Sequence, residues 1–382
     1  MAKKKNETPG KVSLDNIKDL LNKSAGMKVA RHLGSGDNPS NVKDWIPTGS
    51  TWLDSIVCRG KSAGIPVGKI TEIAGLEGSG KSYMAAQIAA NANKLGMEVI
   101  YFDSEAAIDE EFLSRMGCIE GKFLYITAYS VEQVLEAVET VMNSGSTRKL
   151  FIWDSLANTP TSTDVEGTFN PQETIGLKAR ILSKAMMKLT VPLSQTNSTF
   201  LVLNQLKTNI TRDVAAAMID PYVTPGGKSM HYASSLRIYL TGRKAKASYF
   251  YDDKGFRAGS EVKAKLKKSR FGTEGRECIF RILWGGEDVR ILDEESIFLA
   301  IKDSDRVKNR GAFYCLIDKD GKESKKFYKA DFQNLYLTNE EFRATAKDII
   351  DEEVILKFEK REGDASKFYD IDGDKPDEEK VG

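Results

Sequence analysis

The stretch GLEGSGKS at residues 75–82 has the residue types of a loop that binds phosphate. Its glycines allow backbone dihedrals in which successive N–H groups point at one anion. The lysine and the hydroxyl at its end can reach the β- and γ-phosphates and a magnesium ion. An apolar strand (69–75) precedes the loop and a helix (81–95) follows, so the helix dipole also favours an anion. The predicted phosphate-binding residues are Gly75, Leu76, Glu77, Gly78, Ser79, Gly80, Lys81, Ser82 and Tyr83.

Three further apolar stretches predict strands that finish in polar residues, namely 97–105, 149–155 and 199–205. In a parallel sheet the carboxyl ends of the strands lie on one edge, where ligands bind. Asp154 is a candidate for an indirect ligand of Mg²⁺. Glu105 is a candidate for the base that orients and deprotonates a water molecule. Gln205 both donates and accepts hydrogen bonds, which suits the sensing of a γ-phosphate. For each residue alone, a helix cap or a solvated strand end is the alternative interpretation.

The order of the predicted elements indicates the fold class. Helices at 109–116, 131–143 and 176–193 alternate with the strands. Such alternation, with nearly continuous apolar strands, predicts an α/β fold with a mostly parallel central sheet covered on both faces. The later stretches SLRIYLTG, SEVKAKLKKSR and ECIFRILWG are shorter and more exposed in character, and we expect them to extend the sheet as antiparallel strands.

The composition of the 382 residues is that of an ordinary soluble globular chain, with 41% hydrophobic and 29% charged residues. No apolar run approaches the roughly 18 residues of a membrane span, so we expect no membrane partner. The four cysteines are far apart and form no C-x-x-C pair, which argues against a disulfide or zinc framework and fits a reducing cytoplasm. With only two histidines, a histidine-rich metal site is excluded.

We expect three regions: an N-terminal helical arm and linker (1–45), a core (46–290) and a small C-terminal α+β domain with an acidic tail (291–382). Residues 13–33 predict an amphipathic helix on a linker at 34–44, which either folds back on its own core or docks on a neighbouring subunit. Residues 1–31 hold eight basic and three acidic residues, whereas 351–382 hold twelve acidic and six basic. Such asymmetry accompanies nucleic-acid binding, but solvated ends show it too.

Several stretches resemble, in order and spacing, the RecA-type homologous recombinase family. The matching stretches are PTGSTWLD (47–54), GLEGSGKS, YFDSEAAID (101–109), LFIWDS (150–155), GLKARILSKAMMKL (176–189), FLVLNQLK (200–207) and TPGGKSMHYAS (224–234). The resemblance covers roughly residues 46–290 and implies a RecA-type P-loop ATPase core with ATP and Mg²⁺ as cofactors. It implies that Lys81 and Glu105 are catalytic, that Gln205 is the nucleotide switch, and that Ser82 and Asp154 hold the metal.

The resemblance also implies contacts beyond the phosphates. Asp109 and Phe112 would contact adenine, and two lysines that reach a neighbouring subunit's ATP fall on Lys268 and Arg270. The sequence thus departs from the cellular bacterial pattern in having arginine for the second lysine and a slightly shorter 224–234 stretch. In these two features it is more similar to the phage-encoded (UvsX-like) branch. The family's two DNA-binding loops would lie at about 158–175 and 206–227, and the second directly follows the switch. The predicted DNA-binding residues are Phe169, Lys207, Arg212, Tyr222, Gly226, Gly227 and Lys228.

The function implied by the resemblance is homologous pairing and strand exchange by an ATP-dependent helical filament on single-stranded DNA, in recombination, repair and recombination-dependent replication. Double-stranded DNA, further copies of the chain, single-strand-binding proteins and mediator proteins are the expected partners. The expected location is the cytoplasm, or the host's cytoplasm if the chain is phage-encoded. Three alternatives remain: a ring helicase on the same core, a mediator-type paralogue, which would not need Glu105 and Asp154, and an ABC-type ATPase, whose LSGGQ-like signature this sequence lacks.

Overall fold

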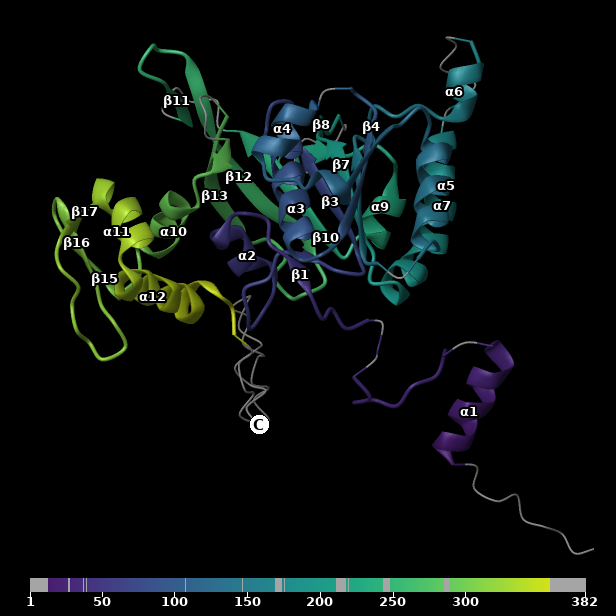
Figure 1. Cartoon of the computed structure of the whole chain (residues 1–382), viewed down its shortest axis with the longest axis horizontal. Helices are drawn as coiled ribbons and strands as arrows, with labels where there is room; N and C mark the ends of the chain where they lie inside the picture. The colour runs from purple at the N-terminus through teal and green to yellow at the C-terminus, as the bar shows by residue number, and fades with distance from the viewer. Residues whose placement is uncertain are drawn as a thin grey trace, which may run out of the picture.

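A ten-stranded sheet forms the centre of the molecule (Figure 1). The computed structural model describes residues 13–357 except 27, 37, 39, 107, 146, 169–173, 175, 211–217, 219, 243–247 and 285–288. The strand order is β14-β13-β12-β10-β3-β7-β6-β4-β5, with β11 paired to β12. Six strands are parallel: β3 (Ile70–Gly75), β4 (Glu98–Asp103), β5 (Phe123–Thr127), β6 (Lys149–Asp154), β7 (Thr199–Gln205) and β10 (Leu236–Gly242). Four are antiparallel: β11 (Tyr249–Tyr251), β12 (Arg257–Ser269), β13 (Glu277–Leu283) and β14 (Arg290–Ile291).

Helices cover both faces of this sheet, as the sequence predicts for buried parallel strands. On one face, α2 (Thr51–Val57) and α3 (Lys81–Lys94) bury apolar side chains against β3, β4, β10 and β13. On the other face, α5 (Val131–Met142) and α7 (Leu177–Gln195) pack against β4, β6 and β7. Trp153 of β6 lies in this second layer, fully buried and stacked on Phe200 of β7. The predicted α/β fold with a mostly parallel central sheet is therefore confirmed.

One detail of the predicted sheet is wrong. The stretch SLRIYLTG forms β10, which runs antiparallel to β12 as expected but parallel to β3. The chain reaches β10 through α9 (Lys228–Ala233), and this helical crossover returns it to the starting edge in the same direction as β3. The parallel part of the sheet therefore extends one strand further than predicted.

The N-terminal helix α1 (Leu14–Ala25) lies apart from the rest of the molecule at the end of an extended segment (Figure 1). It begins at Ser13, whose hydroxyl accepts a hydrogen bond from the Asn16 N–H, and it ends at Gly26, which is left-handed with φ 63°. This stop makes the helix shorter than the predicted span of 13–33. None of its residues is buried, and Leu14 and Leu20 are 72% and 68% exposed.

The elements of the C-terminal cluster lie beside β13 (Figure 1), and their apolar side chains join the core on that side of the sheet. They are α10 (Asp293–Ile301), β15 (Val307–Arg310), β16 (Phe313–Leu316), β17 (Phe327–Tyr328), α11 (Phe332–Thr338) and α12 (Glu340–Ile349), with a π-helical turn at Ile350–Val354. Phe298, Phe327, Phe332 and Phe342 pack together, with the Phe298 and Phe332 ring centroids 5.1 Å apart. Three antiparallel strands and helices around an aromatic core are consistent with the predicted small α+β unit.

The remaining elements are short. They are β1 (Trp45–Ile46), β2 (Ile65–Pro66), α4 (Glu110–Arg115), α6 (Ser162–Glu166), β8 (Lys207–Thr208), β9 (Tyr222–Val223) and 3₁₀ turns at Glu120–Lys122 and Lys329–Asp331. Among the described residues, no helix combines the length and the apolar character that crossing a membrane requires.

Candidate nucleotide site and DNA interface

The phosphate loop joins β3 to α3 at the carboxyl edge of the parallel strands. Gly80 precedes α3 with a left-handed backbone (φ 84°), and a Cβ atom at this position would collide with the Ile282 side chain. Gly78 is left-handed as well, with φ 65°. Both positions therefore need glycine for backbone reasons, and the resulting turn directs N–H groups of the loop and of the helix N-terminus into one concave surface.

The loop is built to receive a polar ligand. The Ser79 hydroxyl is buried, and it has no hydrogen-bond partner within the described part of the chain. Lys81 Nζ lies across the loop and donates to the carbonyl oxygens of Gly75 and Leu76 at 3.3 and 3.1 Å. Burial lowers the pKa of Lys81, while the acids Asp154, Glu105 and Glu77 oppose this shift. An orphaned hydroxyl and a cation held only by carbonyls fit the phosphates of a nucleotide.

Ser82 and Asp154 lie side by side below the loop. The Ser82 hydroxyl donates to Asp154 Oδ2 at 2.7 Å, and the buried Tyr101 hydroxyl donates to the same oxygen at 2.7 Å. Burial raises the pKa of Asp154, and these two hydrogen bonds hold the pKa down against that effect. A hydroxyl beside a carboxylate at the phosphate loop is the donor set that a Mg²⁺ site on this loop needs. The Tyr101 contact is not visible in the sequence, because the two residues meet only across β4 and β6.

Glu105 is held at the end of β4 by the residues around it. Asp103 Oδ1 accepts the N–H groups of Glu105 and Ala106 at 2.7 and 2.9 Å, and Ala106 has a left-handed backbone with φ 50°. The Glu105 carboxylate accepts hydrogen bonds on a single oxygen, Oε1, from the Ser155 hydroxyl (2.8 Å) and the Asn158 amide (2.7 Å). A side-chain turn and a positive φ thus place this carboxylate beside the phosphate loop.

Gln205 ends β7 opposite the last residue of β3, Gly75. Its Nε2 donates to Asn158 Oδ1 at 3.3 Å, so Gln205, Asn158 and Glu105 form one hydrogen-bonded chain. The structure therefore brings together the loop, Lys81, Ser82, Asp154, Glu105 and Gln205, which the sequence places on the same sheet edge. Asn158, which joins two of them, was not predicted, and no motif singles it out.

A buried polar network lies under Gln205. Arg237 of β10 forms an ion pair with the fully buried Glu72 of β3. The other Glu72 oxygen accepts the Asn204 amide at 2.8 Å, and the same amide donates to the Pro225 carbonyl at 3.0 Å. Arg237 also donates to the Thr224 hydroxyl at 3.0 Å. The end of the predicted second DNA loop is therefore fastened to the strand that carries Gln205.

Two cations are predicted to reach the neighbouring subunit. Lys268 lies near the end of β12, and Arg270 follows directly after this strand. Lys268 Nζ donates to the carbonyl oxygens of His231 and Tyr232, and Arg270 donates to that of Tyr232 at 2.7 Å. Both cations thus cap the end of α9. Within the described part of the chain, their hydrogen bonds go to α9 and not to the phosphate loop. Their contact with the nucleotide of another copy therefore stays a prediction.

Asp109 precedes α4 and Phe112 lies on it. Asp109 caps this helix by accepting the Phe112 N–H at 2.6 Å, and the Phe112 ring packs edge-on against Tyr83 with centroids 4.8 Å apart. Asp109 also lines a hollow of about 810 Å³ between α4 and β5, together with apolar side chains such as Leu113 and Phe123. The structure thus gives Asp109 a capping role, and its contact with adenine stays a prediction.

The predicted DNA residues fall into three groups. Phe169 and Arg212 lie outside the described residues. Lys207 and Lys228 are exposed, and Lys207 belongs to the two-stranded ribbon of β8 and β9 at the base of the second loop. Tyr222 belongs to the same group as these lysines, because it lies in this ribbon, on β9, where it is partly buried against Leu206 and Tyr239.

The third group is the glycine pair at 226–227. Gly226 is left-handed (φ 98°), and a Cβ atom there would come within 3.1 Å of Leu156 and 3.0 Å of Leu182. A Cβ atom on Gly227 would come within 3.1 Å of Ala179. The pair therefore has a packing role, because it lets the second loop end close against α7, and its contact with DNA stays a prediction.

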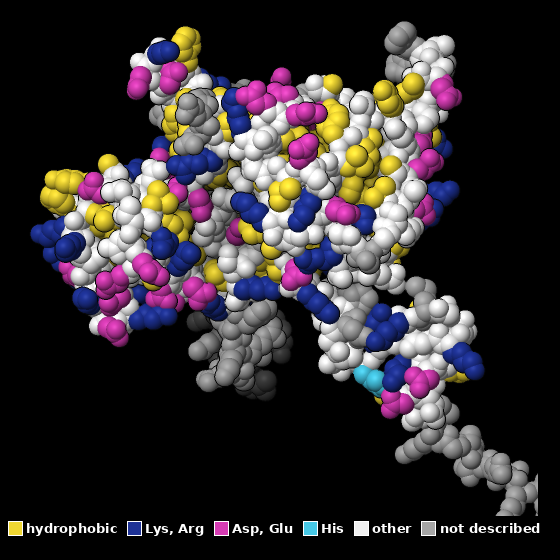
Figure 2. Space-filling model, in the orientation of Figure 1, with side chains coloured by type: hydrophobic (Ala, Val, Ile, Leu, Met, Phe, Trp, Pro, Cys, Tyr) yellow, Lys and Arg dark blue, Asp and Glu magenta, His cyan; other side chains and the backbone are white. Residues whose placement is uncertain are grey.

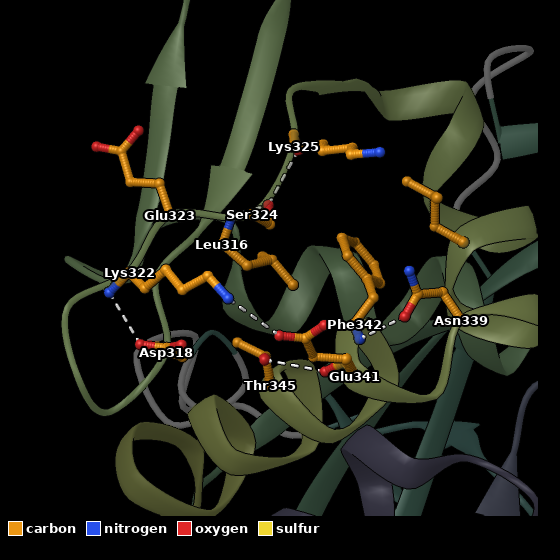
Figure 3. Close-up of a pocket in the computed structure, with 11 residues that line it drawn as sticks. Leu316, Asp318, Lys322, Glu323, Ser324, Lys325, Asn339, Glu341, Phe342 and Thr345 are labelled. Atoms are coloured by element: carbon orange, nitrogen blue, oxygen red, sulfur yellow. Dashed lines mark hydrogen bonds and ion pairs between the residues drawn. The ribbon is translucent and has the colours of Figure 1, made fainter.

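A further hollow, of about 280 Å³, lies in the C-terminal cluster between β16 and α12 (Figure 3). Leu316, Leu335 and Phe342 contribute apolar lining, and the charged side chains of Lys322 and Glu341 meet at its edge at 3.6 Å. None of the predicted site residues lines it, so it is separate from the chemistry at the phosphate loop.

A phosphate loop on the carboxyl edge of a parallel sheet, with an acid behind its serine, defines an α/β protein of the P-loop class. The chain matches the model of the RecA N-terminal domain family over residues 11–288. It therefore belongs to the RecA family.

Known proteins agree with this assignment. Protein RecA of Thermus aquaticus is 32% identical over 273 residues, which cover 72% of this chain and 76% of that protein. Protein RecA of Ruminococcus albus is 32% identical over 295 residues, with 74% and 70% covered. The mitochondrial DNA repair protein recA homolog of Dictyostelium discoideum is 31% identical, with 70% and 56% covered. A crystal structure of the RadB recombinase is similar at 22% identity and a TM-score of 0.47 over 64% of this chain and 98% of that one. This last likeness is loose, and the family assignment does not depend on it.

Proposed function

We propose that the protein is an ATP-dependent DNA recombinase that forms a helical filament on single-stranded DNA and catalyses homologous pairing and strand exchange. The observation that carries the proposal is the meeting of Glu105 and Gln205 through Asn158 at the point where both predicted DNA loops begin. A nucleotide bound at the phosphate loop would therefore act on both loops through side chains that already touch. Family membership and the printed names of the relatives support this function.

The residues of the nucleotide site have distinct roles in this proposal. Lys81 and the loop N–H groups bind the phosphates, and Ser82 with Asp154 hold Mg²⁺, which supplies charge neutralisation on the phosphates. Glu105 accepts a proton from a water molecule that it orients. Gln205 senses the γ-phosphate, and Lys268 and Arg270 act on the nucleotide of a neighbouring copy. Arginine in place of a second lysine supports, within this proposal, the phage-encoded branch.

The arm α1 supports a filament of repeated copies. Its apolar side chains, including Leu14, Leu20 and Leu21, are exposed on a helix that buries none of its residues within the described part of the chain. The hollow between α4 and β5 has an apolar lining and an acidic rim that includes Asp109, Glu110 and Glu120. Since residues 1–31 carry five more basic than acidic residues (8 − 3), the arm of one copy matches this hollow on the next in both polarity and charge.

Figure 2 shows hydrophobic side chains gathered on the surface between β4 and α5. Leu124 and Tyr125 of the edge strand β5 are 54% and 40% exposed, and Tyr129 after it is 67% exposed. An edge strand with exposed apolar side chains is a site for pairing with another chain.

The experiment that tests the proposal combines two measurements on the full chain. ATP hydrolysis is measured with and without single-stranded DNA, and the products are viewed by electron microscopy. We expect hydrolysis that DNA stimulates and helical filaments on the DNA. A closed ring of copies would contradict the filament and favour a ring helicase, and the absence of hydrolysis under both conditions would favour a mediator-type paralogue.

A further inference from the structure

The hydrogen-bonded chain from Glu105 to Gln205 has a fixed polarity. An ionised carboxylate only accepts hydrogen bonds, so the group of Asn158 that faces Glu105 Oε1 is its NH₂. The carbonyl oxygen of Asn158 must then face Gln205, and the Gln205 group that meets it is its own NH₂. The orientation of both amides is therefore dictated by the charge on Glu105.

The turn that carries Asn158 is held by hydrogen bonds from the side chains around it. The next residue, Thr159, is buried, accepts the Trp153 indole N–H at 2.8 Å and donates to the Ser155 carbonyl at 2.9 Å. From α7, which follows the first predicted DNA loop, Lys178 Nζ reaches back to the Ala157 carbonyl at 3.3 Å. The turn that carries Asn158 is thus fastened to β6 on one side and to the far end of the first DNA loop on the other.

We propose that Asn158 is a positioning residue that sets the Glu105 carboxylate according to the state of Gln205 and of the first DNA loop. This inference rests on the proposed ATPase function. Only Oε1 of Glu105 accepts hydrogen bonds within the described residues, which leaves Oε2 for a water molecule. Ser155 holds the carboxylate regardless of ligands, whereas Asn158 ties it to the two elements that respond to nucleotide and to DNA. Stimulation of hydrolysis by DNA therefore depends on Asn158.

The test compares Asn158→Ala with Ser155→Ala. Misplacing a catalytic group by about 1 Å costs about 100-fold in rate. We expect Asn158→Ala to lose up to about 100-fold of the DNA-stimulated kcat while KM for ATP stays near that of the parent. Ser155→Ala, which removes the other donor to the same oxygen, should lower the rates with and without DNA by the same factor.

A second variant of Asn158 tests its role through the pH dependence of kcat, which a purely structural residue would leave unchanged. Asn158→Asp places a second carboxylate beside Glu105, and two close carboxylates resist ionising together. The acid limb of the kcat–pH profile should therefore move to higher pH in Asn158→Asp and not in Ser155→Ala. Lys81 of α3 and Asp154 of β6, whose charges also interact with Glu105, are the same in all variants.

The outcomes separate this inference from the proposed function. If the parent does not hydrolyse ATP, the proposed function fails. If the parent is stimulated by DNA and Asn158→Ala keeps that stimulation, only the role of Asn158 is overturned. Equal losses in hydrolysis, ATP binding and DNA binding for Asn158→Ala would likewise overturn it, because they indicate a structural defect.

Discussion

Glu105 is the residue whose surroundings differ most from those of an ordinary strand end. Asp103 fixes its backbone, Ala106 after it is left-handed, and two donors converge on one of its oxygens. A solvated strand end or a helix cap, the alternative interpretations from sequence, needs none of these contacts. The geometry therefore favours a carboxylate that is placed for a task.

We predict that Glu105→Gln keeps ATP and DNA binding but loses most hydrolysis. The loss of a base that acts on a positioned water commonly costs 10²–10⁴-fold. The check is steady-state hydrolysis beside DNA affinity with ATP, and filaments of the variant should persist longer than those of the parent. Turnover near the parent's rate would remove Glu105 from the mechanism.

For Lys81→Ala we expect weaker nucleotide binding and no strand exchange. Lys81 is the cation of the phosphate loop, and its Nζ already lies over the loop carbonyls that the phosphates would approach. Titration calorimetry with ATP measures the effect, and the exposed Lys94 at the other end of α3 offers a matched control as Lys94→Ala. Equal ATP affinity in Lys81→Ala and the parent would contradict the assignment.

Residue types at strand ends can be predicted from sequence, but their partners cannot. Ser82, Asp154, Glu105 and Gln205 follow from a loop motif and from the rule that ligands bind at the carboxyl ends of parallel strands. Tyr101 and Asn158 have no such signal, because an aromatic residue inside a strand and an asparagine in a loop are common everywhere. Their contacts arise only when β4, β6 and β7 lie side by side.

At the scale of elements, β3, β6 and β7 were predictable because both of their faces are buried, which leaves an unbroken apolar run. The edge strand β5 was not predicted, although its residues 123–127 read FLYIT and most of them favour strands. The run has only five residues, and its side chains are only partly buried or exposed. The direction of β10 was also beyond the sequence. The same apolar run fits a parallel or an antiparallel neighbour, and the crossover through α9 decides between them.

The ion pair between β3 and β10 yields a stability prediction. Arg237→Met leaves the fully buried Glu72 without its cation, and breaking a buried pair from one side costs about 3–5 kcal/mol. We expect a clear drop in thermal midpoint for Arg237→Met, measured by calorimetry. The double variant Glu72→Gln/Arg237→Met should recover much of the loss, and a double variant no more stable than Arg237→Met would show that the charge on Glu72 is not the cause.

Asp54 of helix α2 makes the stability of the fold depend on pH. Asp54 accepts the Thr48 hydroxyl at 2.7 Å, yet burial raises its pKa to about 7. Between the ordinary value of about 4 and about 7, the folded state then holds a proton that the unfolded state has lost. This contribution to stability is present at low pH and decreases by about 1.4 kcal/mol per unit as the pH rises through that window.

The measurement is the thermal midpoint of the parent and of Asp54→Asn at pH 5, 6, 7 and 8. Relative to the parent, Asp54→Asn should gain stability as the pH rises, because asparagine resembles the protonated acid at every pH. Asp293→Asn is a comparison variant, because burial raises the pKa of Asp293 only to about 6. Its gain in stability relative to the parent should therefore level off at a lower pH than that of Asp54→Asn. A difference between parent and Asp54→Asn that is constant with pH would contradict the shift.

At the scale of the whole molecule, α1 buries none of its residues within the described part of the chain. We predict that Leu20→Glu abolishes filaments while ATP binding by the monomer is retained. Leu20 is 68% exposed, so a charge there costs the isolated subunit little. Light scattering with ATP and DNA measures assembly, and Asp19→Lys, a charge change on the opposite face of the same helix, is the control. Filaments of Leu20→Glu at the parent's concentration would show that α1 is not the contact.

The separation of α1 from the core has a consequence for how copies add to one another. If the helix of one copy occupies the hollow between α4 and β5 of the next, the contact joins two different surfaces, and in an open row it leaves one surface of each kind free. A row of copies then has unlike ends, one with a free helix and one with a free hollow. Monomers would join these ends at different rates, so growth would be directional, and below a critical concentration of monomer no row would persist.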